Sequence, residues 1–200
     1  MDGDRTATGP LDSAAMTDVR VRRATTADLS ASEVEVIRAI LWAAFDDPAE
    51  PEESFTEHDW EHGLGGIHVV AERDGRIVAH GSVVDRGLRV AGRRIAAGYV
   101  ESVATEPGLQ RTGLGSAVMG EIGAIIGERY EAGFLGTGEH AFYERLGWRT
   151  WRGPLSVRTA DGERRTPDEE GYIMVLRTAS SPPLDLDAPL SCDWRPGDVW

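Results

Sequence analysis

The amino-acid sequence predicts an α/β protein of the α+β kind, with a mixed, mostly antiparallel central sheet flanked by helices. Three observations support this fold class. Period-two apolar runs predict one strand near the N-terminus, three strands in succession and further strands later in the chain. Helical runs separate these strands. Asp74-Gly75 is the strongest short hairpin signal, and it favours antiparallel neighbours over a purely parallel, doubly wound sheet.

The elements are expected in a definite order along the chain. They are a strand at 19–24, a helix at 29–45 with Asp28 as N-cap, a short helix capped by Thr56, strands on both sides of Asp74-Gly75, a third strand after Gly92, a helix at 113–130, a strand at 133–137, a short helix ending at Gly147 and a strand at 148–154. Apolar residues at helical spacing mark the buried faces of the two long helices: Leu29, Val36, Ile37, Ile40, Leu41 and Ala44, then Leu114, Val118, Ile122, Ile125 and Ile126.

The last part of the chain is expected to be less regular. Residues 154–159 and 171–177 predict a hairpin pair separated by a turn-rich segment, and residues 178–200 predict a polar, proline-spaced coil. Residues 1–18 are rich in Gly, Thr, Ser and Asp and predict a disordered tail. The length of the remainder, 19–200, suits a single domain.

Composition excludes several classes of protein. No long apolar run exists and the N-terminus lacks signal-peptide features, so a cytoplasmic protein without a membrane partner is expected. Cys192 is the only cysteine, which rules out an internal disulfide and a multi-thiolate zinc site within one chain. All 21 basic residues are arginine, so Schiff-base and pyridoxal phosphate chemistry on a lysine is impossible.

The negative charge is large and unevenly distributed. A formal charge of -13 argues against nucleic acid and favours a cationic small molecule as partner. No arginine lies between Ala39 and Glu72, whereas eight carboxylates fall within residues 46–61. Such a run is usually a solvated loop, and a neighbouring site would be needed to give it a role in binding.

The segment "QRTGLG" at residues 110–115 follows a predicted strand and precedes a predicted helix. A Gly-containing turn at a helix N-terminus presents free N–H groups and the positive end of the helix dipole, which suits a pyrophosphate. The pattern alone is equally typical of a plain strand-to-helix turn. It matches neither a dinucleotide fingerprint nor a P-loop, because the glycine spacing and the lysine are absent.

Two segments resemble motifs of the GNAT N-acetyltransferases. Residues 100–119 resemble the acetyl-CoA-binding segment, with its pattern Q/R-x-x-G-x-G/A, and "AFYERLGW" at 141–148 resembles a later helix motif. Four further segments resemble the aminoglycoside 2′-N-acetyltransferases, so that the similarity extends over about residues 19–200: "FTEHDWEH", "GYVESVA", "RTPDEEG" and "CDWRPGDVW". The resemblance implies a GNAT fold with splayed fourth and fifth strands, a homodimer, and acetyl transfer from acetyl-CoA to a cationic aminoglycoside in a ternary complex without an acyl-enzyme.

The resemblance also implies roles for particular residues. Glu101 matches the proposed base and Tyr143 the proposed acid; without the motifs they would be an outward strand carboxylate and a core aromatic. Positions that match the cofactor-binding groups are Val103, Thr105, Gln110, Arg111, Thr112, Gly113, Leu114 and Gly115. Positions that match the acceptor-binding groups are Asp59, Glu101, Glu169, Asp198 and the carboxylate of Trp200, so residues 178–200 are expected to contribute to the acceptor site.

Some features leave the acceptor open. Ser54-Phe55 replaces an Asp-Phe pair of some relatives and the segment 136–142 is shortened, and both bear on aminoglycoside preference. An acetyltransferase for another amino sugar, from cell-wall or thiol metabolism, and a non-catalytic acyl-CoA-binding regulator are the alternatives. His58 and His62 could share a zinc ion in a hydrolase, but no Glu directly follows the first histidine, so no metal is expected. Tryptophans that could line the acceptor cleft are Trp60 and Trp200.

Overall fold

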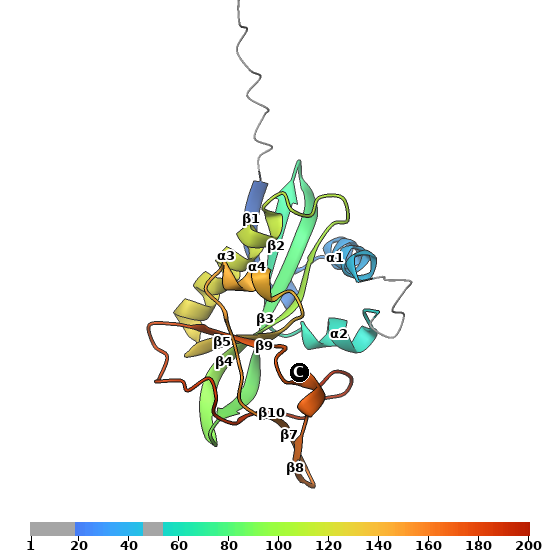
Figure 1. Ribbon diagram of the computed structural model, residues 1–200. Coiled ribbons are helices and arrows are strands. Elements are labelled where there is room, and N and C mark those ends of the chain that lie inside the picture. The colour runs from blue at the N-terminus through green and yellow to red at the C-terminus, as the bar shows by residue number, and fades with distance from the viewer. Residues whose placement is uncertain (1–18, 46–53) are drawn as a thin grey trace, which may run out of the picture.

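The computed structural model describes residues 19–45 and 54–200, so the predicted tail at 1–18 and the acidic residues at 46–53 lie outside the described residues. A curved sheet forms its centre, with helices on both faces (Figure 1). The strands are β1 (Val19–Thr25), β2 (Ile67–Arg73), β3 (Arg76–Val90), β4 (Arg93–Thr105), β5 (Ala132–Gly136), β6 (Arg149–Thr150), β7 (Leu155–Thr159), β8 (Gly162–Arg165), β9 (Ile173–Arg177) and β10 (Leu190–Asp193). The helices are α1 (Ala31–Ala44), α2 (Glu57–His62), α3 (Leu114–Arg129) and α4 (His140–Glu144), with 3₁₀ turns η1 (Thr26–Asp28) and η3 (Pro167–Glu169).

The strands β2, β3 and β4 form the antiparallel meander that the sequence predicts, and β1 pairs with β2. Two-residue turns connect them. Asp74 and Gly75 have φ angles of 53° and 75°, and Ala91 and Gly92 have φ angles of 46° and 80°. Positive φ at both turn residues is the geometry that matches the twist of paired strands. The long strands β3 and β4 are thereby set side by side, and β4 carries the candidate site.

The second half of the sheet differs from the prediction. The expected hairpin between residues 154–159 and 171–177 is wrong, because β7 pairs with β8 whereas β9 pairs with β5 and β6. The expected coil at 178–200 is also wrong in part, because β10 lies between β3 and β7. Leu190 and Cys192 are fully buried there, and tertiary pairing makes a strand of a segment whose composition is typical of coil.

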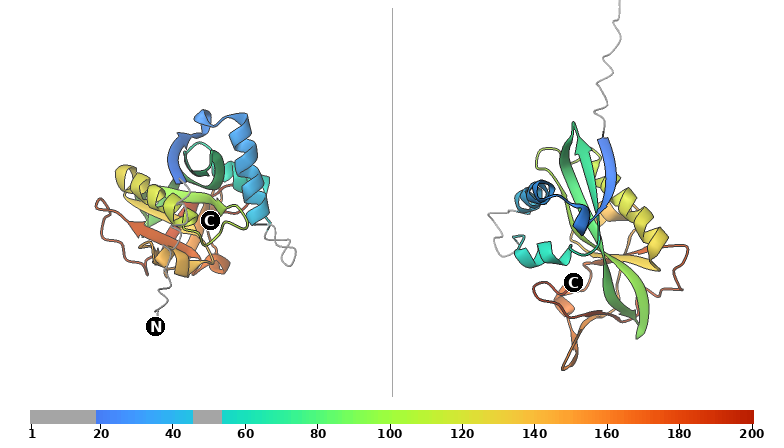
Figure 2. Two further views of the ribbon diagram at one scale, coloured as in Figure 1. Left: turned by 90° about the horizontal axis from the view of Figure 1, so that it is seen from above. Right: turned by 180° about the vertical axis from the view of Figure 1, so that it is seen from behind.

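The helices cover opposite faces of the sheet, with α1 and α2 on one side and α3 on the other (Figure 2). The apolar stripe predicted for α3 is buried along its whole length. The N-cap of α1 is Ser30 rather than Asp28, since Ser30 and Glu33 form a reciprocal capping box. Asp28 instead accepts hydrogen bonds from the backbone and hydroxyl of Thr25 and closes η1.

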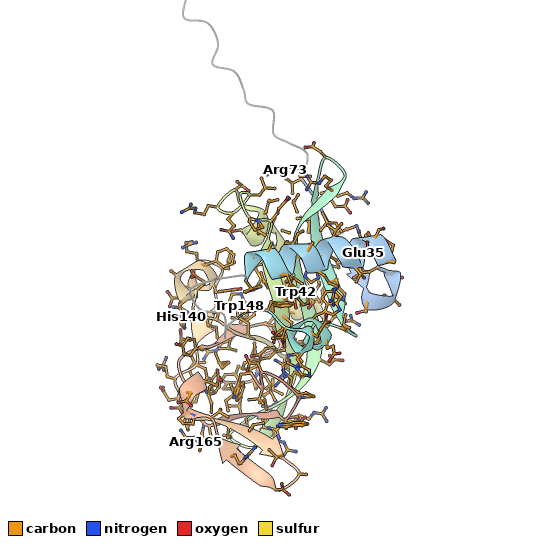
Figure 3. The ribbon with its side chains drawn as sticks, turned by 90° about the vertical axis from the view of Figure 1, so that its right-hand side faces the viewer. Glu35, Trp42, Arg73, His140, Trp148 and Arg165 are labelled. Atoms are coloured by element: carbon orange, nitrogen blue, oxygen red, sulfur yellow. The ribbon has the colours of Figure 1, made fainter. Side chains whose placement is uncertain are left out.

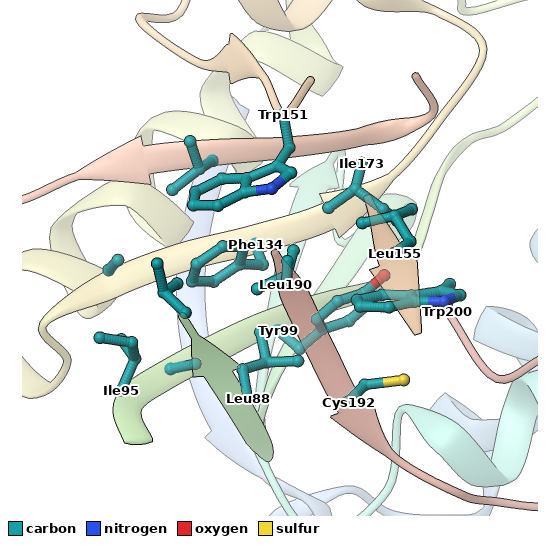
Figure 4. Close-up of a cluster of buried hydrophobic side chains, with 14 of the residues drawn as sticks. Leu88, Ile95, Tyr99, Phe134, Trp151, Leu155, Ile173, Leu190, Cys192 and Trp200 are labelled. Carbon is teal, nitrogen blue, oxygen red and sulfur yellow. The ribbon is translucent and has the colours of Figure 1, made fainter. Parts of the chain in front are cut away.

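Aromatic residues organise two of the hydrophobic clusters. Trp42 extends from α1 toward α2 (Figure 3), and its ring meets Phe55 edge-on at 4.9 Å between centroids. In the cluster beneath β4 and β5, the side chains of Tyr99 and Trp200 lie side by side (Figure 4), with exposed fractions of 1% and 4%. The end of the described chain is thus part of the hydrophobic core.

Candidate active site

A cleft of about 1070 Å³ opens where β4 and β5 separate. The two parallel strands pair only from Ala97 to Tyr99 on β4, opposite Ala132 to Phe134 on β5. Residues 100–105 of β4 then line the cleft. Among the described residues, their backbone groups are not paired with β5. An unpaired strand edge inside a cleft offers amide and carbonyl groups to an extended ligand.

The N-terminus of α3 faces the same cleft. Gly113 occupies the N-cap with φ of 92° and without a side-chain cap, and a Cβ built on it would meet open space. Arg111 also has positive φ, at 61°. This tight turn leaves the first N–H groups of α3 pointing outward, where they suit an anion.

The structure separates the residues of the predicted cofactor segment into two groups. Val103, Thr105, Gln110, Arg111, Gly113 and Gly115 line the cleft. Thr112 and Leu114 do not: the hydroxyl of Thr112 donates to the carbonyl of Leu109 at 2.6 Å, and Leu114 is buried in the core. Sequence reasoning missed Ser116, which also lines the cleft, although its place in the first turn of α3 was a usable signal.

Tyr143 reaches the cleft from α4. Its ring packs edge-on against Phe142 and Trp148, with centroid distances of 4.9 and 6.2 Å, and only 8% of the residue is exposed. Burial, and secondarily the charge of Glu139, raise the pKa of Tyr143 to about 12. The phenol is therefore protonated at neutral pH and can donate a proton.

Glu101 lines the cleft from β4, and its carboxylate accepts a hydrogen bond from Arg195 Nη1 at 2.5 Å. Burial raises the pKa of the Glu101 carboxyl above its usual range, while the Arg195 guanidinium is the largest opposing influence. A carboxylate and a phenol thus lie in one cleft, one able to accept a proton and the other to give one.

The backbone beside Glu101 is bulged. The register between β3 and β4 shifts between His80 and Ser82, and Ser102 has φ of 54°. The carbonyl of Ser102 accepts a hydrogen bond at 2.8 Å from Nδ1 of His80. Because a carbonyl can only accept, His80 carries its proton on Nδ1 and its Nε2 is an acceptor when the ring is neutral.

A second histidine continues this hydrogen-bonded chain. His68 Nδ1 donates to His80 Nε2 at 2.9 Å, and the hydroxyl of Thr26 donates to His68 Nε2 at 2.8 Å. Burial lowers the pKa of His68 to about 4, and burial together with the neighbouring ring lowers that of His80 to about 3. Both rings are neutral at pH 7, and the chain fixes the bulge next to Glu101.

Three of the predicted acceptor-binding residues gather near Glu101. Burial, and then the charge of Asp198, raise the pKa of Glu169 in η3, and Asp198 also raises the pKa of Glu101. Asp198 Oδ1 accepts a hydrogen bond from the backbone N–H of Trp200 at 3.0 Å. The Trp200 indole donates to Thr166 Oγ1 at 2.8 Å. The main-chain oxygen of Trp200 accepts a hydrogen bond from Arg195 Nη2 at 3.1 Å.

Asp59 stands apart from these carboxylates. Its side chain accepts from the backbone and the hydroxyl of Thr56, both at 2.7 Å, and thereby caps α2. Trp60 and Trp200, the two tryptophans that could line the acceptor cleft, are 6% and 4% exposed, and Trp60 packs near the ring of His68. His62 Nε2 lies 2.8 Å from the carbonyl of Pro196. Within residues 19–45 and 54–200 no cluster of three metal-ligating side chains occurs.

Residues 25–151 match the family of acetyltransferase (GNAT) domains. The chain therefore belongs to the GNAT family and is an acetyltransferase, which confirms the family and the fold class predicted from the motifs. Among curated proteins, it is 36% identical over 179 residues to the aminoglycoside 2′-N-acetyltransferase of Mycolicibacterium fortuitum, covering 88% of this chain and 89% of that protein.

Solved structures agree with this fold. One is a GNAT family N-acetyltransferase from Escherichia coli in complex with CoA, with a TM-score of 0.58, 18% identity and coverage of 94% of this chain and 93% of that chain. Another is a GNAT family acetyltransferase from Brucella melitensis in complex with acetyl-CoA, with a TM-score of 0.54, 16% identity and coverage of 84% and 93%. Among the described residues, no helix combines the length and hydrophobicity that crossing a membrane requires.

Proposed function

We propose that this acetyltransferase transfers the acetyl group of acetyl-CoA to the 2′-amino group of an aminoglycoside. One observation carries the proposal: Glu101, Tyr143, the unpaired edge of β4 and the uncapped N-terminus of α3 all line or open onto one cleft. The 36% identity to an aminoglycoside 2′-N-acetyltransferase supports the acceptor class.

The residues of the cleft fit acetyl-CoA. The backbone of Val103 and Thr105 would pair with the pantetheine arm, and the amides that follow Arg111 would hold the diphosphate at the N-terminus of α3. Gly113 supports this fit, since no side chain occupies the space where a diphosphate would lie. Acetyl-CoA supplies an activated acetyl thioester when bound.

Two side chains would carry the proton transfers. An acceptor amine arrives as an ammonium ion, and Glu101 would take up its proton directly or through one water. Tyr143 would give its proton to the departing thiolate, which is a better leaving group when protonated. No covalent enzyme intermediate is needed, since the amine nitrogen forms the new bond to the acetyl carbon as the bond to sulfur breaks.

The electrostatics of the acceptor side favour a polycation. The charge of Asp198 adds to the cost of ionising the partly buried Glu169, and an ammonium group beside Glu169 would relieve that cost. The formal charge of -13 adds long-range attraction for cations. Charge-assisted hydrogen bonds of this kind contribute roughly 1.5–3 kcal/mol each.

The test is release of free CoA thiol, measured with the purified protein against a panel of aminoglycosides and simpler amino sugars. Acceptors that carry a 2′-amine should react, and matched compounds with a 2′-hydroxyl should not. Equal rates with both groups would contradict the regiochemistry, and turnover only with simple amino sugars would replace the aminoglycoside by another acceptor.

The proposal also covers the oligomeric state of the enzyme, the compartment in which it acts and its effect on aminoglycoside resistance. We infer a homodimer from the family resemblance, and light scattering coupled to size-exclusion chromatography would measure it. We infer that the enzyme acts in the cytoplasm, where acetyl-CoA is present and where a chain with the single cysteine Cys192 needs no disulfide. The net negative charge of the protein is unsuited to binding nucleic acid. Expression in a susceptible host would test aminoglycoside resistance as minimum inhibitory concentrations.

A further inference from the structure

Arg195 reaches Glu101 from a segment 94 residues further along the chain. Both side chains are 13% exposed, and Arg195 Nη1 donates to Glu101 Oε1 at 2.5 Å. The two other nitrogens of the guanidinium also have oxygen partners: Nε donates to the carbonyl of Asp198 at 2.7 Å, and Nη2 to the main-chain oxygen of Trp200 at 3.1 Å. The guanidinium is therefore fixed in one orientation by three acceptors.

Other titratable groups also lie around Glu101. Arg86 on β3, Asp198 in the C-terminal segment and Tyr99 on β4 act on it, and the chain-end oxygen of Trp200 shares the Arg195 guanidinium. Arg86 donates instead to a carbonyl of the C-terminal segment and lies over the Tyr99 ring, with 5.1 Å from Cζ to the centroid. Arg195 lies over the same ring at 5.8 Å. Arg195 is thus the group that touches the Glu101 carboxylate.

A buried carboxyl group tends to be neutral, because burial disfavours the charged form. Burial is indeed the largest influence on Glu101 and raises its pKa, and the ion pair with Arg195 opposes it most strongly. A protonated Glu101 could not accept a proton from an ammonium group. The contacts of Arg195 with the backbone of Asp198 and Trp200 lie within the C-terminal segment itself, and they direct the guanidinium so that its remaining Nη1 meets the Glu101 carboxylate on β4.

We propose that Arg195 is a positioning residue for acetyl transfer, which holds Glu101 ionised and oriented in the cleft so that the carboxylate can take up the acceptor's proton. This inference rests on the proposed role of Glu101 as base. It assigns the C-terminal segment a task beyond binding the acceptor: it supplies the counter-charge of the base.

The experiment measures the charge of Glu101 directly. Protein labelled with ¹³C at the Glu side-chain carboxyls is titrated by NMR, and the Glu101 signal is identified by its loss in Glu101→Gln. In Arg195→Met the titration midpoint of the Glu101 carboxyl should move to higher pH by about one to three units. The acid limb of the kcat/KM profile should move to higher pH by a similar amount, since the base is then protonated at higher pH. Arg195→Lys keeps the charge and should show a smaller shift than Arg195→Met.

The matched control is Thr166→Val. It removes the 2.8 Å hydrogen bond that anchors the Trp200 indole but changes no charge, so it should loosen the C-terminal segment without moving the midpoint. Arg195→Gln carries the same prediction as Arg195→Met, and it replaces that variant if the methionine prevents folding, as judged by circular dichroism.

Three results would overturn the proposal: an unchanged Glu101 midpoint in Arg195→Met or its Gln substitute, equal shifts with Lys and Met, or an equal shift in Thr166→Val. The last would mean that loosening of the segment, rather than loss of charge, is responsible. Failure of the proposed function looks different. If the midpoint moves as expected while Glu101→Gln turns over at the wild-type rate, the ion pair stands, but Glu101 is not the base and Arg195 has no catalytic positioning role.

Discussion

Burial affects the pKa of Glu101 and of Tyr143 in the same direction, but the nearest charged neighbours of the two residues have opposite effects. Burial raises the pKa of each group. For Tyr143 the charge of Glu139 adds to the effect, and the phenol keeps its proton. For Glu101 the guanidinium of Arg195 works against it and favours the carboxylate. The two residues are thereby set apart as proton acceptor and proton donor by what surrounds them, and single substitutions can test each role.

Glu101→Gln should lower turnover by about 10²–10⁴-fold and leave the affinity for acetyl-CoA unchanged, because the amide cannot accept the proton but keeps the shape of the cleft. Stopped-flow release of CoA and isothermal calorimetry measure the two quantities. Glu106→Gln is the control, since Glu106 follows β4 directly but does not line the cleft. Turnover at the wild-type level would remove Glu101 from the mechanism.

Tyr143→Phe should slow thioester cleavage about 10²-fold or more, with little change in acceptor binding, because it removes the proton donor and keeps the ring. The raised pKa of about 12 also means that ionisation of Tyr143 should cause no loss of activity below about pH 11. Single-turnover rates test the first point. Tyr130→Phe, at the other tyrosine whose pKa is raised to about 12, should have no effect on the rate.

At the scale of helices and strands, the sequence predicts those features of the fold that depend on residues close together in the chain. The buried stripe of α3, the turn at Asp74-Gly75 and the glycine turn before α3 follow from local spacing and backbone preference, and all occur. The contact between His68 and His80 does not follow from the register that this turn predicts. A bulge between Ala71 and Glu72 shifts the register by one residue, so that His68 lies opposite Ser82 and diagonally from His80.

Gly113→Asp should abolish acetyl-CoA binding, because it places a carboxylate at the positive end of α3, where a diphosphate would lie. Calorimetry measures the affinity. Gly113→Asn has nearly the same shape and also tolerates positive φ, so it should bind more tightly than the Asp variant. Gly120→Asp adds the same charge to an exposed position of α3 and should leave binding intact. Equal affinities for all three variants would place the cofactor elsewhere.

The histidine pair between β2 and β3 should make the fold sensitive to acid. The folded-state pKa values of about 4 and about 3 lie below the value near 6.5 of the unfolded chain, so the unfolded state binds more protons as pH falls from about 6.5 to about 3. Stability is therefore complete above about pH 6.5 and declines below it, by up to about 1.4 kcal/mol per pH unit for each histidine.

Urea unfolding at pH 7 and at pH 5 measures this decline. The double variant His68→Gln, His80→Gln should be less stable than wild type at pH 7 but should lose less on going to pH 5. His58→Gln, at an exposed position of α2, is the control and should follow the wild-type slope. If the double variant loses as much stability as wild type, the pair does not account for the acid sensitivity.

At the scale of the molecule, the acceptor side is assembled from distant parts of the chain, which is why sequence reasoning without the family resemblance could not find it. Glu101 on β4, Glu169 in η3 and Asp198 near the end interact through their charges, although 97 residues separate the first from the last (198 − 101). Local composition gave no sign of β10 or of the Arg195 contact, since both depend on tertiary pairing.

Asp198→Asn should raise the Michaelis constant of the acceptor about tenfold or more and leave acetyl-CoA binding near normal, because one charge-assisted contact to an ammonium group is lost. The amide oxygen can still accept from the backbone of Trp200, so the fold should persist. Steady-state kinetics measure the constant. Asp187→Asn, whose exposed carboxylate pairs with Arg152, is the control. An unchanged constant in Asp198→Asn would exclude this carboxylate from the acceptor site.

The position of β10 between β3 and β7 has a consequence for how the protein folds. The hairpins of β2, β3 and β4 join residues close in sequence, so their loops close quickly. Leu190 pairs with Val90, one hundred residues earlier (190 − 90), and such distant pairings form slowly. We therefore expect the β2–β4 meander to form before β10 joins β3, which would leave this flank of β3 an open strand edge in the interval.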